Sequence, residues 1–311
     1  MGIVVIGGGV IGLTCALELA RAGRRVTVIS ADPPERTTSA VAAAVWFPYE
    51  AAPEDDVLRW GAATLNAFTA LAADPATGVA LRSGVVCHRT PDPDLGWTRV
   101  VGGHRPATAA ELPDGVPSGT RCTLPVIEMG PYLRWLRDAA VTAGVEVRHG
   151  RIARLGDVDA GADAIVVAAG LGSGPLTDDP SMVPVRGQVA RLRNPGLTDW
   201  ILDDDNPAGL TYMIPRGADV VAGGTAERGA DDLAADPATE DAILRRVRAL
   251  APALRDAEVL TRGVGLRPVR PAVRLERHTV DGRPVISCYG HGGAGVTLSW
   301  GCAADVVALA G

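Results

Sequence analysis

A glycine-rich turn between a strand-like run and a helical run constrains the fold more than any other feature of the chain. Residues 2–6 (GIVVI) are apolar and mostly β-branched, as a strand buried on both faces of a parallel sheet requires. Residues 10–22 have the apolar spacing of a helix that ends near Gly23, and residues 24–30 (RRVTVIS) read as a second strand. The segment predicts a strand–helix–strand unit within a doubly wound sheet.

The turn inside this unit has the pattern GxGxxG. The first glycine permits a tight turn, the second lets the backbone approach a pyrophosphate, and the third lets the helix pack closely on the strand. The helix N-terminus favours the phosphate charge, and Asp32, just beyond the second strand, suits a ribose hydroxyl. The pattern predicts a bound dinucleotide but leaves NAD and FAD both open. Its expected contacts are Gly7, Gly9, Val10, Ile11, Gly12 and Asp32.

Two further glycine turns favour FAD. The run AIVVAAGLGSG leads a buried strand into a turn at Gly170. The run YGHGGAGVTLSWG places Gly292, Gly293 and Gly295 at the start of a C-terminal helix. The partial positive charge of that helix end, under a flavin pyrimidine, would favour the N1–C2=O anion of reduced flavin, whereas a nicotinamide has no use for it.

The rest of the chain predicts a second domain interleaved with the first. Helices are expected at 53–74, 129–144 and 236–254, strands at 79–89 and 97–103, and a β-meander at 186–226. We therefore predict an α/β fold, in which a doubly wound, FAD-binding Rossmann-like domain adjoins an α+β substrate domain on a mixed, largely antiparallel sheet. The FAD domain is expected to comprise 1–50, 130–185 and 262–311, and the substrate domain 51–129 and 186–261.

Composition excludes several classes of protein. The net charge of −6 argues against general nucleic-acid binding. The five cysteines are widely scattered without a CxxC or Cys/His cluster, which indicates buried, reduced thiols and neither a metal site nor a disulfide scaffold. We find no charge-free run of about 18 apolar residues that suggests a membrane span. The N-terminus resembles no secretory signal and the C-terminal ALAG is no peroxisomal tripeptide, so we expect a cytoplasmic chain that is either bacterial or trimmed at that end.

Nearly end to end, the chain resembles the D-amino-acid oxidases, within the FAD-dependent amine oxidases. The resemblance is carried by VVIGGGVIGLTCALELA, TTSAVAAAVWFPY, AIVVAAGLGSG, VRGQVARL, YMIPR, GLRPVRPAVRLE and YGHGGAGVTLSWGCA. The last two together are highly specific, whereas the first is shared by most flavoproteins of this fold. The resemblance implies non-covalent FAD and hydride transfer from the substrate Cα to flavin N5. The products would be an imino acid, which hydrolyses to a 2-oxo acid and ammonia, and H2O2 from O2.

The resemblance also implies the substrate contacts. Arg267 in GLRPVRP matches the guanidinium that binds the substrate carboxylate, and Tyr212 in YMIPR matches a tyrosine whose hydroxyl meets the same group. The carbonyl of Gly293 matches the acceptor for the substrate amine. Catalysis would rest on positioning and electrostatics, because the family requires no side chain as the base for Cα–H cleavage.

Further cofactor contacts follow from the same resemblance. Thr37, Thr38 and Ser39 match residues near the pyrophosphate and ribityl chain. Ala44 and Val45, with Ala43 beside them, match the backbone around flavin N5 and O4, and Ile152 matches a contact to adenine. The pyrimidine edge is matched by Gly295, Val296 and Thr297, with Gly292 beside them.

The chain departs from vertebrate members of the family in two places. A lid tyrosine four residues before Tyr212 is replaced by Ala208 in a shorter segment, which suggests a more open site. Phe47 stands where vertebrate relatives have a glutamine. The partners we expect are a D-amino acid and O2, with no nucleic acid or membrane, in a monomer or homodimer. The alternatives are a glycine/sarcosine-type or D-aspartate-type oxidase, an NAD-dependent dehydrogenase, and a flavin-binding protein without turnover.

Several conspicuous side chains have competing interpretations. His291 suggests a general base but is more typical of a structural histidine bonded to backbone. Arg216 suits an acidic substrate side chain or a solvated surface. The acidic run 203–205 suggests a metal patch or, more typically, a solvated turn. Trp46 and Trp300 are more typical of a core than of substrate stacking.

The arginine-rich segment 261–277 (TRGVGLRPVRPAVRLER) raises a question of direction. Its prolines hold it extended, so its side chains alternate between two faces. Arg267 and Arg270 are an odd number of residues apart and are expected to point oppositely. We therefore predict that Arg267 faces the substrate, while Arg270, Arg274 and Glu276 make packing contacts, ion pairs or links between domains.

Overall fold

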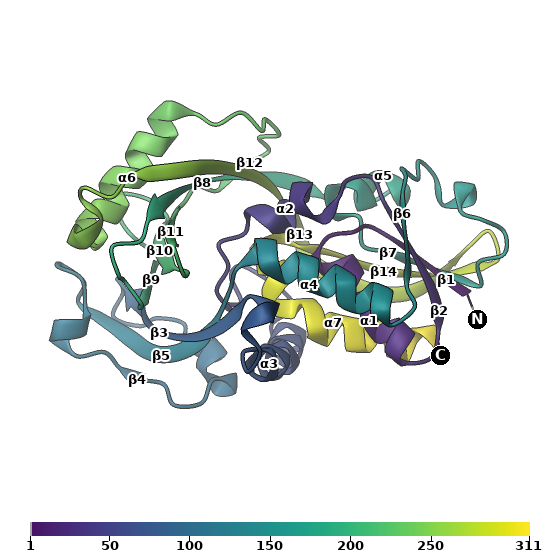
Figure 1. The fold of residues 1–311 in the computed structure, drawn as a ribbon, viewed down its shortest axis with the longest axis horizontal. Coiled ribbons are helices and arrows are strands. Elements are labelled where there is room, and N and C mark those ends of the chain that lie inside the picture. The colour runs from purple at the N-terminus through teal and green to yellow at the C-terminus, as the bar shows by residue number, and fades with distance from the viewer. Residues whose placement is uncertain (1) are drawn as a thin grey trace.

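The computed structural model describes residues 2–311, which form two parts on one continuous sheet (Figure 1). Its strands lie, in spatial order, as β4 (Arg105–Pro106), β5 (Ser118–Ile127), β3 (Val79–His88), β9 (Trp200–Asp203), β10 (Thr211–Pro215), β11 (Asp219–Gly223), β8 (Val183–Arg193), β13 (Val259–Val280), β14 (Arg283–His291), β7 (Ala164–Val167), β1 (Gly2–Ile6), β2 (Arg25–Ser30) and β6 (Glu146–His149), with β12 (Glu227–Arg228) beside β8. The predicted combination of a parallel and a largely antiparallel sheet is confirmed.

The parallel part consists of β14, β7, β1, β2 and β6, and it contains the predicted strand–helix–strand unit. The alternate residues of β1 are buried on both faces: Ile3 and Val5 in the main core, Val4 and Ile6 in a second cluster. The helices α3 (Glu54–Leu71), α7 (Gly295–Ala310), α1 (Val10–Arg21) and α4 (Met129–Thr142) lie side by side in a layer beneath the sheet (Figure 1). Two short helices are α2 (Thr38–Val41) and α5 (Ser173–Leu176).

The closing helix is apolar along most of its length. Together with the preceding 3₁₀ turn (Gly292–Ala294), α7 is long and apolar enough to cross a membrane by length and composition. It packs between α1 and α3, and Gly301 permits this, because a Cβ there would collide with the backbone of Trp60. Core packing of this helix accounts for its apolar composition.

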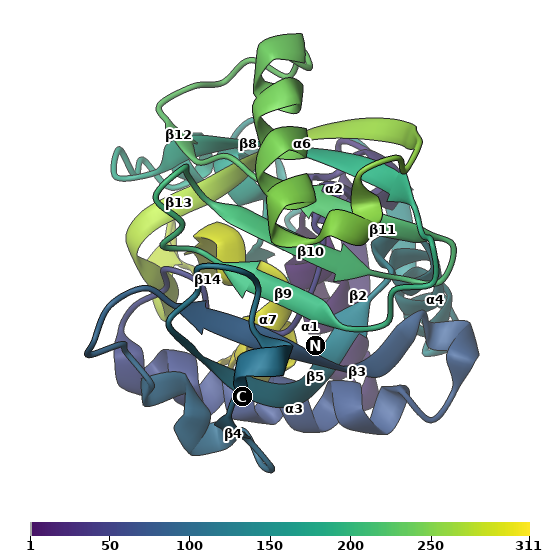
Figure 2. The ribbon, with the colours of Figure 1, turned by 90° about the vertical axis from the view of Figure 1, so that its left-hand side faces the viewer.

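The antiparallel part contains the predicted meander and more. β8, β11, β10 and β9 pair antiparallel in that order, and α6 (Pro237–Leu250) covers their outer face (Figure 2). Asp236 caps α6, as expected, by accepting from the backbone N–H of Thr239 at 2.9 Å. Strands β9 and β5 were not predicted from the sequence. The strand predicted at 97–103 is wrong, because Asp94 starts a 3₁₀ turn (Gly96–Val100) whose Trp97 packs edge-on against Phe47.

The long strand β13 joins the two parts. Its first half pairs with β8 and its second half with β14, with a register shift between Val269 and Arg274. The predicted domain boundary at 261/262 thus falls inside one strand. The division into two domains stays a prediction, while the sheet itself passes through both.

Candidate active site

One large cavity, of about 760 Å³, receives residues from both parts of the molecule. The glycine turns of the parallel part line one end, and strands β9, β10 and β13 line the other. Every predicted cofactor and substrate residue lies along it except Gly12. Residues that the sequence analysis drew from separate segments are therefore brought to one surface.

The GxGxxG turn has the geometry that its residue types require. Gly7 has φ of 120°, and a Cβ on it would collide with the carbonyl of Ala168 on the neighbouring β7 connection. A Cβ on Gly12 would strike the carbonyl of Gly7, so Gly12 serves the approach of α1 and lies behind the cavity wall. Gly9 stays at the surface, as the N-cap of α1. The turn fits a pyrophosphate at the N-terminus of α1.

The adjoining segments shape the adenosine end. Ser39 reaches the turn and accepts a hydrogen bond from the backbone N–H of Val10 at 3.1 Å. Ser30, at the end of β2, donates to the carbonyl of Asp32 at 2.6 Å, which fixes the loop that carries Asp32. Ile152 lines the same end, together with two arginines that the sequence analysis did not name, Arg36 and Arg151.

The opposite wall holds the backbone of residues 43–47 against the start of α7. Ala44 exchanges backbone hydrogen bonds with Ile127, and the hydroxyl of Thr297 donates to the carbonyl of Phe47 at 2.8 Å and accepts from its N–H at 3.1 Å. The cavity therefore has a second helix N-terminus, at Gly295, facing a fixed backbone segment. This arrangement fits an isoalloxazine ring.

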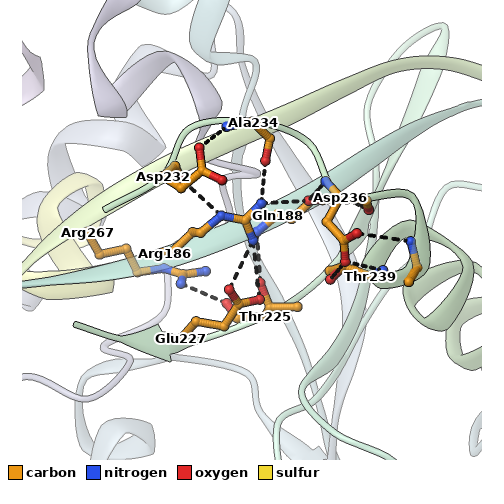
Figure 3. Close-up of polar contacts among 10 residues, drawn as sticks. Arg186, Gln188, Thr225, Glu227, Asp232, Ala234, Asp236, Thr239 and Arg267 are labelled. Carbon is orange, nitrogen blue, oxygen red and sulfur yellow. Dashed lines mark hydrogen bonds and ion pairs between the residues drawn. The ribbon is translucent and has the colours of Figure 1, made fainter. Parts of the chain in front are cut away.

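Arg267 enters the cavity from β13 and lies flat on the neighbouring strand. Its Nη1 donates to the carbonyl of Thr225 at 2.8 Å (Figure 3). A Cβ on Gly187, in β8, would come within 2.5–2.7 Å of the guanidinium atoms, so the absence of a side chain there makes room for the fork. The hydrogen bond to Thr225 and the close approach to the backbone of Gly187 together hold the guanidinium in one orientation.

Behind Arg267, a buried polar network ties the loop before α6 to β8 (Figure 3). Arg186 donates to the carbonyls of Asp232 and Ala234 and to the side chains of Glu227 and Gln188. Gln188 in turn donates from its backbone N–H to the hydroxyl of Thr225 at 3.0 Å, so the network also holds the residue that receives Arg267.

Tyr212 and Gly293 complete the substrate end. The ring of Tyr212 lies against Gly223 and Gly224, where no side chain could be accommodated, and burial raises the pKa of its hydroxyl. Gly293 lies across from Arg267, and a Cβ on it would be 3.6 Å from Arg267 Cδ. The predicted carboxylate and amine contacts thus face one space.

Two residues of the site were missed by the sequence analysis. Tyr49 packs on Gly293, where an added Cβ would be 2.8 Å from its Cδ1, and burial raises the pKa of its hydroxyl. Tyr49 ends the segment VWFPY that carried part of the resemblance, which is the signal that could have found it. Asp204, in the turn after β9, also lines the cavity.

Other expectations need correction. Arg216 is neither solvated nor free, because it is buried and donates to both carboxylate oxygens of Asp219 at 2.9 and 2.8 Å. The run 203–205 is a solvated turn only at Asp205, because Asp203 is fully buried and paired with Arg89 and Asp204 is partly buried. Trp46 and Trp300 are buried in the core, as expected.

The histidine and the cysteines also differ from expectation in part. His291 is buried, its Nε2 has no hydrogen-bond partner among residues 2–311, and burial lowers its pKa to about 4, so it is neutral near pH 7. All five thiols are free and buried, as predicted. The scattered spacing hid one cluster, however: β14 and α7 bring the ligand atoms of Cys288, His291 and Cys302 within 4.8 Å of one another.

A doubly wound sheet with a phosphate-type glycine turn, joined through one cavity to a guanidinium held by the second part of the sheet, defines a dinucleotide-binding protein with a second compartment beside the cofactor site. The sequence comparison specifies the family. The chain belongs to the FAD dependent oxidoreductase family DAO, whose model matches residues 2–309. FAD is therefore its cofactor, and the prediction of FAD is confirmed.

Similar proteins agree with this family. The chain is 51% identical to a D-amino-acid oxidase of Rubrobacter xylanophilus over 310 residues, which cover 99% of this chain and 95% of the relative. It is 43% identical to a D-amino-acid oxidase of Streptomyces coelicolor, with 99% and 96% covered. The fold is similar to that of a glycine oxidase from Geobacillus kaustophilus, with a TM-score of 0.83, 19% identity, and 99% and 93% covered.

Proposed function

We propose that the chain is a D-amino-acid oxidase. The observation that carries the proposal is the Arg267 guanidinium, held flat between Gly187 and the carbonyl of Thr225 at the substrate end of the FAD cavity. In the proposed reaction a D-amino acid, O2 and water give a 2-oxo acid, ammonia and H2O2. The names of the two relatives support this substrate class.

Three groups of the chain would orient the substrate. Arg267 binds the carboxylate bidentately, and the hydroxyl of Tyr212 donates to the same carboxylate. The carbonyl of Gly293 accepts from the neutral amine. Bound FAD supplies the acceptor for the hydride that leaves Cα. With carboxylate and amine both fixed, only one enantiomer directs its Cα–H toward the backbone wall of residues 43–45.

The structure weighs against a D-aspartate-type oxidase based on Arg216. Its guanidinium is buried and both carboxylate oxygens of Asp219 occupy it, so it offers nothing to a second substrate carboxylate. A glycine- or sarcosine-type oxidase shares the fold, and selectivity among substrates separates it from the proposed function. The family membership excludes the NAD-dependent dehydrogenase considered above.

A peroxide assay with matched enantiomers tests the proposal. The purified yellow holoenzyme is incubated with D- and L-alanine, D- and L-methionine, glycine and sarcosine, and H2O2 is measured with a coupled peroxidase. We expect peroxide from the D-enantiomers alone. Turnover of glycine or sarcosine in preference to D-methionine would replace the proposal with the alternative oxidase, and no turnover of any amine would leave a flavin-binding protein.

We also propose that the protein acts in the bacterial cytoplasm, without a nucleic-acid or membrane partner, as a monomer or homodimer. Its net charge of −6 and the core position of α7 support this, and five free thiols suit a reducing compartment. Cell fractionation and size-exclusion chromatography with light scattering test these points. Recovery in the membrane fraction or as a larger oligomer would contradict them.

A further inference from the structure

The three consecutive acids after β9 have three different environments. Asp203 is fully buried, and its carboxylate accepts from Arg89 Nε at 2.9 Å and Nη2 at 2.5 Å. Asp205 is exposed to solvent. Asp204 is partly buried and lines the active-site cavity. Only Asp204 therefore presents a carboxylate to the space where a substrate would bind.

Within the described part of the chain, no cation pairs with Asp204. Among residues 2–311, no ion pair or side-chain hydrogen bond involves Asp204, whereas the neighbouring Asp203 pairs with Arg89. Burial, with a smaller contribution from the nearby charges of Asp205, Asp203 and Glu50, raises the pKa of Asp204 to about 7. A carboxylate held in a cavity without a cation is costly, and a cationic ligand would relieve the cost.

Asp204 shares the cavity with the reacting groups but is separate from the carboxylate anchor. Burial raises the pKa of the Tyr49 and Tyr212 hydroxyls most, followed for Tyr49 by the charge of Glu50. Asp204 also raises both pKa values, and Arg267 lowers both. The cavity thus has a positive group at Arg267 and a negative one at Asp204. The amine acceptor, Gly293, lies under Tyr49.

The walls near Asp204 suit an aliphatic stem. Leu202 and Leu210, the residues that bracket the turn, line the cavity, as does Phe47. The other basic residues that line it, Arg36 and Arg151, belong to the segments of the adenosine end. A side chain with several methylenes and a terminal cation would find apolar contact along its length and a carboxylate at its end.

We propose that Asp204 forms a side-chain subsite for cationic D-amino acids, of the D-lysine, D-ornithine and D-arginine class. The proposal deepens the proposed function and rests on it. Arg267 and Tyr212 bind the α-carboxylate, and the side-chain cation pairs with Asp204. The same charge disfavours D-aspartate and D-glutamate, whose side-chain carboxylates would face a like charge.

D-Lysine and D-norleucine are a matched pair for the test, because their stems are equally long and only one carries a cation. We measure kcat/KM for both with the holoenzyme, with Asp204→Asn, and with Asp205→Asn as the control from the same turn. Wild type is expected to prefer D-lysine. Asp204→Asn is expected to lower the D-lysine to D-norleucine ratio at least about tenfold, as for loss of a partly desolvated charge pair. Asp205→Asn is expected to leave that ratio within about twofold.

Each other outcome has a defined meaning. A ratio unchanged by Asp204→Asn, or a wild-type preference for D-norleucine, overturns the subsite. An equal loss for both substrates places Asp204 at the α-amine or in the fold, and also overturns it. If Asp204→Asn does not retain FAD, the ratio of kcat/KM for D-lysine to that for D-norleucine is measured with Asp204→Ser instead. That ratio, compared with the wild-type ratio, then decides whether the subsite exists.

Failure of the proposed function is distinguishable from failure of the subsite. If wild type releases no peroxide with any D-amino acid, titration of the flavin absorbance still measures binding of D-lysine and D-norleucine. Tighter binding of D-lysine that Asp204→Asn abolishes retains the subsite without the oxidase activity, and equal binding of the two rejects the subsite.

Discussion

Arg267 depends on its neighbours for its direction. The guanidinium lies on the bare backbone of Gly187 and donates to the carbonyl of Thr225, whose hydroxyl is held from the next strand by the N–H of Gln188 (Figure 3). An arginine side chain has several rotatable bonds, so a fork that must match a carboxylate needs such supports to be pre-organised.

Replacing Arg267 and Tyr212 separates their contributions. Arg267→Leu leaves the substrate carboxylate unpaired, and we expect kcat/KM for D-methionine to fall by the equivalent of about 3–5 kcal/mol. Tyr212→Phe removes one hydroxyl and is expected to cost about 0.5–1.5 kcal/mol. Steady-state kinetics measures both, and the flavin spectrum checks that FAD is retained. Loss of activity in Tyr212→Phe alone would reverse the two roles.

Gly187→Ala tests the support of Arg267 without changing any polar group. The added methyl would stand 2.5–2.7 Å from the guanidinium, so the fork must shift. We expect KM for D-methionine to rise at least about tenfold, because small misplacements of positioning groups have large kinetic costs. Gly156→Ala, where a Cβ meets nothing within 4 Å, is the control. Equal KM values in the two variants would show that Arg267 adapts.

At the residue scale, the sequence could predict side chains whose chemistry is fixed by a local pattern. Gly7, Gly9 and Gly12 are required by one turn, and Arg267 stands in a specific motif. Asp204 could not be predicted, because three identical acids in a row give no sign of which one faces the cavity. The prediction that Arg216 is solvated or free to meet a substrate was wrong for a similar reason. The hairpin of β10 and β11 brings Asp219 to Arg216, and the order of residues alone does not show that this pair forms.

At the scale of elements, β13 shows why an acidic chain concentrates arginines on one strand. Arg267 faces the cavity, whereas Arg270 donates to Asp179 at 2.9 Å and Arg274 donates to the hydroxyl of Tyr289 at 2.8 Å, which itself donates to Asp179 at 3.0 Å. Prolines and spacing predicted the opposite directions correctly. The partner Asp179 could not be predicted, because it comes from a distant connection after α5.

Asp179→Asn is expected to be destabilising in a pH-dependent way. Burial raises the pKa of Asp179, but hydrogen bonds from Ser181, Arg270 and Tyr289 outweigh it and hold the pKa below its usual range. The ionised form therefore contributes stability above the unfolded pKa of about 4, and this contribution is lost as the pH falls below it.

Urea unfolding of the holoenzyme measures this difference. At pH 7 we expect Asp179→Asn to lower the free energy of unfolding by about 1–3 kcal/mol. The gap should narrow toward pH 3, because Asp179 binds a proton there in the unfolded chain while it stays ionised in the folded protein. Exposed Asp138→Asn is the control. A gap of constant size from pH 7 to pH 3 would contradict the assignment.

At the scale of the whole molecule, the sequence predicted two kinds of sheet but not their continuity. The parallel half is marked in the sequence by a βαβ unit and the antiparallel half by a β-meander, and both patterns were predicted correctly. That β13 pairs with β8 from Val259 to Val269 and with β14 from there to Val280 depends on contacts between distant segments. The FAD cavity consequently takes its walls from both halves of one hydrogen-bonded sheet.

Continuity of the sheet has a consequence for unfolding. The cofactor binds only the folded chain, so FAD at about 100 times its Kd adds about 2.7 kcal/mol of stability, and its removal lowers Tm. Because the cavity walls come from both halves and β13 links them, we expect flavin release and loss of secondary structure to occur in one transition. Parallel thermal scans of flavin fluorescence and far-ultraviolet circular dichroism measure the two events. Coincident midpoints that rise together with added FAD would show one cooperative unit, whereas flavin release several degrees before loss of the dichroism signal would show that the parallel half opens alone.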